Sequence, residues 1–148
     1  MTGYGLALDA TALLAYSSSE RDVGHRIAEA ADYGVHVLVP ALCLVRAHQE
    51  ATPGQWEMLE VLAALPHIRV TPVEPNMCSF LGGWSRRMAG HTDLAQLAMD
   101  AATHPLVPIM TDRRELLGEV LPKEWPIIDL RPAGVDKITS RIRSHRGG

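Results

Sequence analysis

The segment LALDATALLA, residues 6–15, opens with three apolar residues, reaches an acid at Asp9 and continues as a second, longer apolar run. Three apolar residues followed by an acid predict a short buried strand that closes at Asp9, with a helix after it. In open parallel α/β sheets, ligand sites form just beyond the carboxyl ends of the strands. The segment therefore predicts an α/β fold and places a candidate functional carboxylate at the edge where such folds bind ligands.

Short apolar runs alternate with longer segments of helical period along the rest of the chain, which is the pattern of βαβ units. Most of the runs are continuous rather than alternating, as expected of strands that helices cover on both faces. We therefore expect a three-layer α/β/α sandwich around a mostly parallel central sheet. The five expected strands are residues 6–9, 36–40, 68–73, 106–111 and 127–130.

The clearest expected helix covers residues 93–103. Two leucines and two alanines at helical spacing share one face of it, while Asp93, Gln96 and Asp100 share the other. This helix is expected to pack by its alanine side. Further helical segments are predicted after Glu20 and after Pro53.

Length and composition predict one compact domain. Of the 148 residues, 47% are hydrophobic and 21% are charged, as in an ordinary globular protein. We expect a single domain over residues 1–132, followed by a basic C-terminal tail over residues 133–148. The formal net charge of −3 lacks the positive field that draws a whole protein to nucleic acid, so any such contact must be local.

The sequence also indicates a compartment. Its two cysteines, Cys43 and Cys78, lie far apart and predict no disulfide framework, so both are expected to be buried thiols in a reducing compartment. No basic residue precedes the first apolar run, and no run approaches the roughly 20 residues that span a bilayer. We expect a cytoplasmic protein with no membrane partner.

Three carboxylates occupy matching places in this pattern. Asp9 closes the first expected strand, Asp93 opens the alanine-rich helix, and Asp112 follows the fourth strand. Gathered at one edge of a sheet, they would suit a hard cation such as Mg²⁺ and phosphodiester chemistry. The alternative is structural, because Asp93 with Gln96 and Asp112 with Glu115 also fit the capping pattern of a helix N-terminus.

Four segments in order resemble the PIN domain family: LALDATALLA at 6–15, VPALCLVRA at 39–47, TDLAQLA at 92–98 and IMTD at 109–112. The resemblance spans nearly the whole chain. It implies an α/β/α sandwich that cleaves single-stranded RNA with Mg²⁺ or Mn²⁺ and often forms a homodimer. Many bacterial members of the family are toxins that a partner antitoxin holds inactive.

Carried over residue by residue, the resemblance makes Asp9 and Asp93 metal ligands that jointly activate the attacking water, with Asp112 as a third catalytic and metal-binding acid. Two positions depart from the family pattern. Arg46 stands where the family has a glutamate, and Arg113 takes the place of the acid in the usual Thr-x-Asp, because Asp112 follows the threonine directly. Both departures replace negative charge by positive charge.

The departures leave two interpretations, an active endonuclease and an inactive PIN-like module that binds nucleic acid or a protein partner. A guanidinium among carboxylates would compete with a cation, so Arg46 would pair with Asp9 or Asp93 if its helix faces the site as in the family. The alternative is an i, i+4 surface pair between Arg46 and Glu50. A third interpretation is an α/β domain of another family that binds a small ligand or accepts a phosphoryl group.

Basic residues flank the expected site, with Arg86 and Arg87 before it and Arg113 after it. In a nuclease these arginines, together with Thr111, would contact the phosphates of a single strand. Short arginine pairs are also common on solvated surfaces, which is the alternative here. His91 lies near a candidate acid, but the pattern favours a surface histidine beside a helix.

Overall fold

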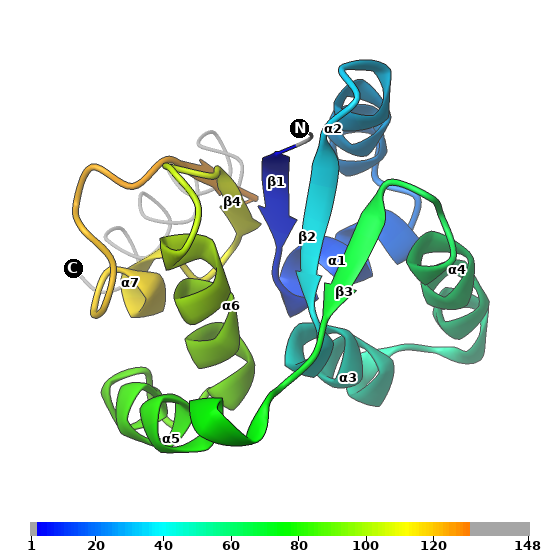
Figure 1. Ribbon diagram of the computed structural model, residues 1–148. Coiled ribbons are helices and arrows are strands. Elements are labelled where there is room, and N and C mark those ends of the chain that lie inside the picture. Colours follow the sequence, from blue (N-terminus) through cyan, green and yellow to red (C-terminus); the bar gives the residue numbers. More distant parts are fainter. Residues whose placement is uncertain (1–2, 131–148) are drawn as a thin grey trace, which may run out of the picture.

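The computed structural model describes residues 3–130, which form a single sheet with helices on both faces (Figure 1). Its strands are β1 (Tyr4–Leu8), β2 (His36–Pro40), β3 (Ile68–Thr71), β4 (Ile109–Thr111) and β5 (Ile127–Asp129). The order in the sheet is β3-β2-β1-β4-β5, and every neighbouring pair is parallel. This confirms the expected α/β/α sandwich, and the described sheet is parallel throughout.

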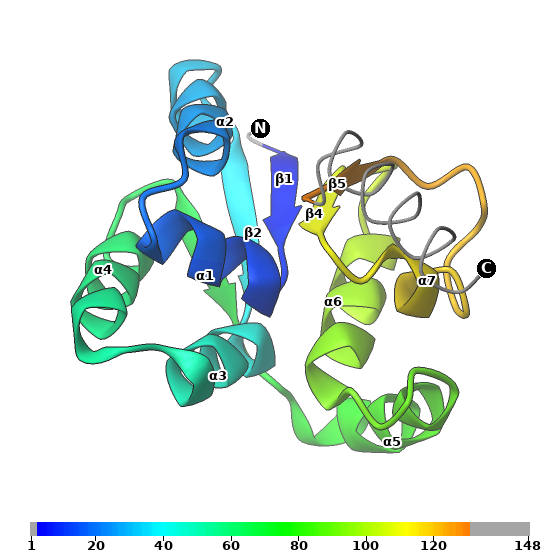
Figure 2. The ribbon, with the colours of Figure 1, turned by 180° about the vertical axis from the view of Figure 1, so that it is seen from behind.

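The helices divide between the two faces of the sheet. They are α1 (Ala10–Ser17), α2 (Arg21–Asp32), α3 (Ala41–Glu50), α4 (Pro53–Ala63), α5 (Cys78–Arg87), α6 (Thr92–Ala102) and α7 (Arg114–Leu117), with a 3-10 turn, η1 (Pro75–Met77). Helices α1 and α2 lie on the face seen in Figure 2, and α6 lies on the opposite face, seen in Figure 1. Because α1 and α3 follow β1 and β2 directly, their first turns lie at the carboxyl edge of the sheet.

The fourth strand begins at Ile109 and not at residue 106 as expected. Leu106 has a positive φ of 43° and is 60% exposed, and Pro108 has no N–H to donate to a neighbouring strand. The apolar run therefore starts as a loop, and only its last three residues form β4. Apolar composition alone does not separate these two parts of the run.

Helix α6 buries both of its faces, whereas the sequence predicts packing by the alanine side alone. The two leucines and two alanines are buried as expected, but Gln96 is fully buried as well. Its side-chain amide accepts a hydrogen bond from the Leu42 N–H at 2.8 Å and donates one to the Thr71 carbonyl at 2.9 Å. Gln96 thereby ties α6 to the first turn of α3 and to the end of β3.

The two cysteines differ in exposure, so the expectation of two buried thiols is wrong for one of them. Cys43 on α3 is fully buried, and its thiol donates to the Asp93 carbonyl at 3.3 Å. Cys78 is exposed at the start of α5, a helix that packs on α6 at the periphery of the fold.

Two further sequence expectations concern the ends and the environment of the chain. The expected basic tail, residues 133–148, lies outside the described residues. Within residues 3–130, no helix has the length and apolar character needed to cross a membrane.

Candidate functional site at the carboxyl edge of the sheet

Asp9 follows β1 directly and is the N-cap residue of α1, where its carboxylate accepts the Ala12 N–H at 2.9 Å. The hydroxyls of Thr11 and Thr111 donate to its two oxygens, at 2.6 and 2.5 Å. Asp9 is only 1% exposed, and burial raises the pKa of its carboxyl from 3.8 to about 6 despite these hydrogen bonds. The hydrogen bonds to Asp9 stabilise its ionised form, but the cost of burying the charge is larger, so the pKa stays above its usual value.

The pairing of β1 with β4 decides which residues after β4 face Asp9. Continued by one residue, the register places Asp9 opposite Thr111, so the two side chains point the same way and form a hydrogen bond. The chain bends at Asp112 after β4 ends, and the Arg113 side chain, paired with the Asp112 carboxylate, lines a small cavity with Asp9. Arg113, and not an acid, is therefore the residue after β4 that lines this cavity.

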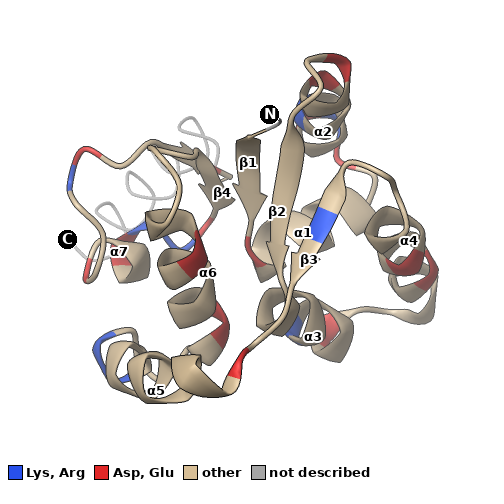
Figure 3. Ribbon diagram, in the orientation of Figure 1, with Lys and Arg blue, Asp and Glu red and all other residues tan. Residues whose placement is uncertain are grey.

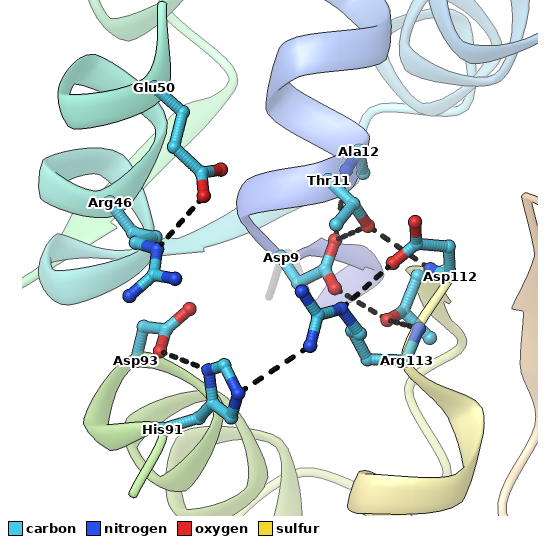
Figure 4. A network of polar contacts seen from close by, with 10 residues as sticks. Asp9, Thr11, Ala12, Arg46, Glu50, His91, Asp93, Asp112 and Arg113 are labelled. Atoms are coloured by element: carbon cyan, nitrogen blue, oxygen red, sulfur yellow. Dashed lines mark hydrogen bonds and ion pairs between the residues drawn. The ribbon is translucent and has the colours of Figure 1, made fainter.

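Asp93 approaches the same edge from the first turn of α6. It is 9% exposed, and among the described residues the sole side-chain partner of its carboxylate is His91, with Oδ1 3.9 Å from Nδ1. The other ring nitrogen, Nε2, lies 3.5 Å from Nη1 of Arg113. The two ring nitrogens of His91 thus face different partners, Nδ1 facing Asp93 and Nε2 facing Arg113. His91 lies between Asp93 and Arg113 (Figure 4).

A small cavity of about 20 Å³ collects these side chains at the carboxyl edge of the sheet. Such a volume has room for about one water molecule or ion. Figure 3 shows acidic residues at the end of β1 and along α6, the two elements that supply its aspartates. The lining residues come from four parts of the chain and are Asp9, Ala10, Thr11, Arg46, Glu50, His91, Asp93, Leu94 and Arg113.

Arg46 and Arg113 both line this cavity, but each has a carboxylate of its own. Arg46 Nε lies 3.3 Å from Glu50 Oε1 on the next turn of α3, and Arg113 Nε lies 3.4 Å from Asp112 Oδ1. The second contact is an ion pair without hydrogen-bond geometry. The expected pairing of Arg46 with a site aspartate is wrong, because the i, i+4 spacing on α3 places Glu50 closer.

The alternative that Asp93 and Asp112 only cap helix N-termini is wrong. The N-cap residue of α6 is His91 and that of α7 is Arg113, and neither helix has a side-chain capping hydrogen bond. Gln96, the expected capping partner of Asp93, instead makes the contacts with α3 and β3 described above. Helix capping therefore does not account for the burial of Asp93.

Four of the predicted residues do not line the cavity. Thr111 is fully buried and donates its hydroxyl to Asp9, so it is not placed to contact a phosphate. Arg86 and Arg87 are the last residues of α5, and the Arg87 guanidinium donates to the Glu119 carbonyl. Asp112 contributes its backbone N–H, which donates to the Thr11 hydroxyl at 3.1 Å, while its carboxylate pairs with Arg113. Thus Asp112 supports the site through its backbone.

Two residues of the site, Thr11 and His91, were not predicted as site residues from the sequence. Thr11 donates to Asp9 and accepts from the backbone after β4, so it joins the two strand ends. The sequence could have indicated Thr11, because it is a hydroxyl residue two positions after Asp9, the acid that ends the first strand. His91 has no comparable signal, because only the tertiary structure brings it beside Arg113.

Comparison with known proteins gives no match: no protein-family model, no curated protein and no solved structure is significantly similar to this chain. The resemblance to the PIN domain family therefore rests on its short motifs, and the function has to be argued from the site.

Proposed function

We propose that this protein is a divalent-cation-dependent nuclease of the PIN type that cleaves single-stranded RNA. The observation that carries the proposal is that Asp9 and Asp93, from elements far apart in the sequence, line one cavity at the carboxyl edge of the sheet. The choice of RNA as substrate, and of an antitoxin as a protein partner, comes from the sequence resemblance alone.

The charge balance of the cavity supports binding of a cation. Arg46 and Arg113 are each offset by an acid on their own segment, so the two pairs add no net charge. Asp9 and Asp93 remain, and within residues 3–130 neither forms an ion pair with a lysine or arginine. Two carboxylates without a cationic partner, both buried, favour a divalent ion at this place.

The donor set fits Mg²⁺ or Mn²⁺ better than a softer metal. Both protein ligands would be carboxylates, and Mg²⁺ commonly takes one or two carboxylates and completes its shell with water and substrate phosphate. Asp9 Oδ2 accepts one hydrogen bond and has capacity for a further partner. In the part of the chain that the structure describes, no group of three or more His, Cys, Asp or Glu side chains is placed to hold a metal ion, so the site offers two ligands.

A bound divalent ion would supply a more acidic water and charge neutralisation for a phosphodiester. The chain's own residues orient the ligands for it. Thr11 and Thr111 hold the two oxygens of Asp9 in fixed directions, which limits the reorganisation that ion binding requires. The His91 ring lies beside Asp93, with Nδ1 3.9 Å from Oδ1, and limits the space open to that carboxylate.

The two arginines also favour a second candidate function, binding of single-stranded nucleic acid without cleavage. Arg46 and Arg113 line the cavity, and their side chains are 40% and 43% exposed. Exposed ion pairs of this kind are weak, so either guanidinium can exchange its carboxylate for a phosphate oxygen. Arg46 and Arg113 would therefore bind the phosphates of single-stranded nucleic acid whether or not the protein cleaves it.

Cleavage of a fluorescent single-stranded RNA, with Mn²⁺ or with EDTA, tests the proposal. We expect cleavage that needs the ion, is lost in Asp9→Asn and persists in Asp32→Asn, the matched control at an exposed position on α2 outside the cavity. Cleavage in EDTA, or by Asp9→Asn, contradicts the proposal. RNA binding without cleavage by the parent, weakened in Arg113→Ala, supports the second function.

A homodimer is the assembly that we propose, formed through an apolar groove on α3, α4 and β3. Val45, Trp56 and Val70 are 52%, 48% and 40% exposed and line this groove of about 590 Å³. Contiguous exposed apolar surface of this kind marks interaction sites, and the family resemblance implies a dimer. Sedimentation should show a dimer of the 16.2 kDa chain that Val45→Asp converts to monomer and Ala28→Asp, at an exposed position on α2, leaves intact.

A further inference from the structure

A second groove runs between α2 and the strands β1, β4 and β5, on the face of the sheet seen in Figure 2. It consists of two adjoining hollows of about 610 and about 320 Å³, which share Arg26, Glu29 and Ile128. Apolar residues of the strands form its floor, and α2 forms a wall. One end of the groove lies at Leu130, where the described chain ends.

The groove lies beside an edge strand. β5 is half-buried along its length, and among the described elements it packs chiefly against β4. An α/β/α sandwich gains stability when a helix or another segment covers an exposed face of its sheet, because apolar side chains on that face are then buried away from water. The groove is therefore suited to an occupant that brings apolar side chains.

The rim of the groove is acidic. Among residues 3–130 it has four carboxylates against one arginine, Arg26, and the acids are Glu20, Asp22, Glu29 and Asp129. The sequence after the described part has the opposite charge. Residues 131–148 carry five basic side chains against one acid, Asp136, and the basic residues are Arg131, Lys137, Arg141, Arg143 and Arg146.

The same C-terminal sequence carries apolar residues at a regular spacing. Val135, Ile138 and Ile142 stand at i, i+3 and i+7, which is the spacing of one helical face. A helix rises about 1.5 Å per residue, so residues 133–145 can match the length of α2, which has 12 residues and forms the wall of the groove. The segment begins at the open end of the groove and is long enough to run along it.

We infer that the C-terminal segment of the same chain, residues 133–146, occupies this groove. Val135, Ile138 and Ile142 pack on the apolar floor, and the basic side chains lie against the carboxylates of α2. The segment covers β5 and completes the layer on this face of the sheet. Its positive charge is then used within the protein and is not available to hold nucleic acid.

Photo-crosslinking of the full chain tests where the segment lies. A p-benzoylphenylalanine in place of Ile142 should form crosslinks within one chain to peptides from α2 or β5, and the same group in place of Ser144, on the opposite helical side, should form far fewer. Crosslinks confined to other parts of the chain, or to a second copy, overturn the inference.

Hydrogen exchange provides a second test that does not depend on a photo-reactive group. In the parent, amides of residues 133–145 should exchange more slowly than in an unstructured peptide, and Ile138→Asp/Ile142→Asp should abolish this protection and speed exchange in α2 and β5 by about tenfold or more. Ser140→Asp/Ser144→Asp adds the same charge on the opposite side and should keep the protection. Unprotected residues 133–145 in the parent contradict the inference.

Discussion

Asp9 and Asp112 each follow a central strand of the sheet, yet only Asp9 lines the cavity. Asp9 is 1% exposed and accepts hydrogen bonds from two hydroxyls and one backbone N–H, whereas the Asp112 side chain is 40% exposed and pairs with Arg113. In sequence the two acids look alike, since each comes directly after an apolar run. The difference lies in the register: Thr111 is the residue opposite Asp9, and Asp112 comes one residue later, in the bend after β4.

The largest expected effect of this difference is on the pH dependence of stability. The folded protein holds the proton of Asp9 more tightly than the unfolded chain, because burial raises its pKa from 3.8 to about 6. This contribution to stability is complete below the unfolded pKa and is lost as the pH rises through about 6. The shift corresponds to roughly 3 kcal/mol.

Urea unfolding at about pH 4 and about pH 7.5 measures this contribution. The free energy of unfolding of the parent should fall between these two pH values by about 2.4 kcal/mol relative to Asp9→Asn, which has no proton to bind there. Asp32→Asn, at an exposed position on α2, should behave as the parent does. Equal pH dependence in the parent and in Asp9→Asn would show that Asp9 is not buried as described.

A smaller effect is expected for the threonine that holds Asp9. Thr111→Val keeps the shape of this fully buried residue but removes the hydroxyl that donates to the carboxylate. We expect a loss of about 1–2 kcal/mol above pH 6, where Asp9 is ionised, and a smaller loss at low pH. Thr103→Val, at an exposed threonine, is the control, and denaturant unfolding of both variants on either side of pH 6 gives the comparison.

Exchanging the two residues after Thr111 sharpens the comparison without a change in composition. Asp112→Arg/Arg113→Asp restores the Thr-x-Asp spacing and should bring a third carboxylate to the cavity. We expect Mn²⁺ to bind about tenfold more tightly, which is about 1.4 kcal/mol. Calorimetric titration of the parent and the exchanged chain decides this, and equal affinities would mean that an aspartate at position 113 adds no ligand to the cavity.

The smallest expected effect concerns the other flank of the cavity. Arg46→Glu removes an exposed i, i+4 ion pair, so the free energy of unfolding should change by less than about 0.5 kcal/mol. The new carboxylate stands at the cavity wall, and Mn²⁺ should bind a few-fold more tightly than to the parent. Arg69→Glu, on β3 and outside the cavity, makes the same charge change and should leave the affinity unaltered.

The fold class was predictable because continuous apolar runs and helical periods are local properties of the sequence. The start of β4 was not predictable, because Leu106 has a positive φ and nothing in the neighbouring sequence indicates it. The convergence of Asp9 and Asp93 also followed from strand ends in a parallel sheet. The burial of Gln96 and the place of Arg113 depend on partners in other elements, and a single sequence contains no local signal for them.

The contacts of Gln96 and Thr111 have a consequence for the order of events during synthesis. Asp9 is made early, but its partner hydroxyl belongs to Thr111, and α6 is tied through Gln96 to segments made long before it. The cavity draws on residues from Asp9 to Arg113, so a nascent chain cannot assemble it until Arg113 has left the ribosome. An incomplete chain therefore carries the aspartates without the site.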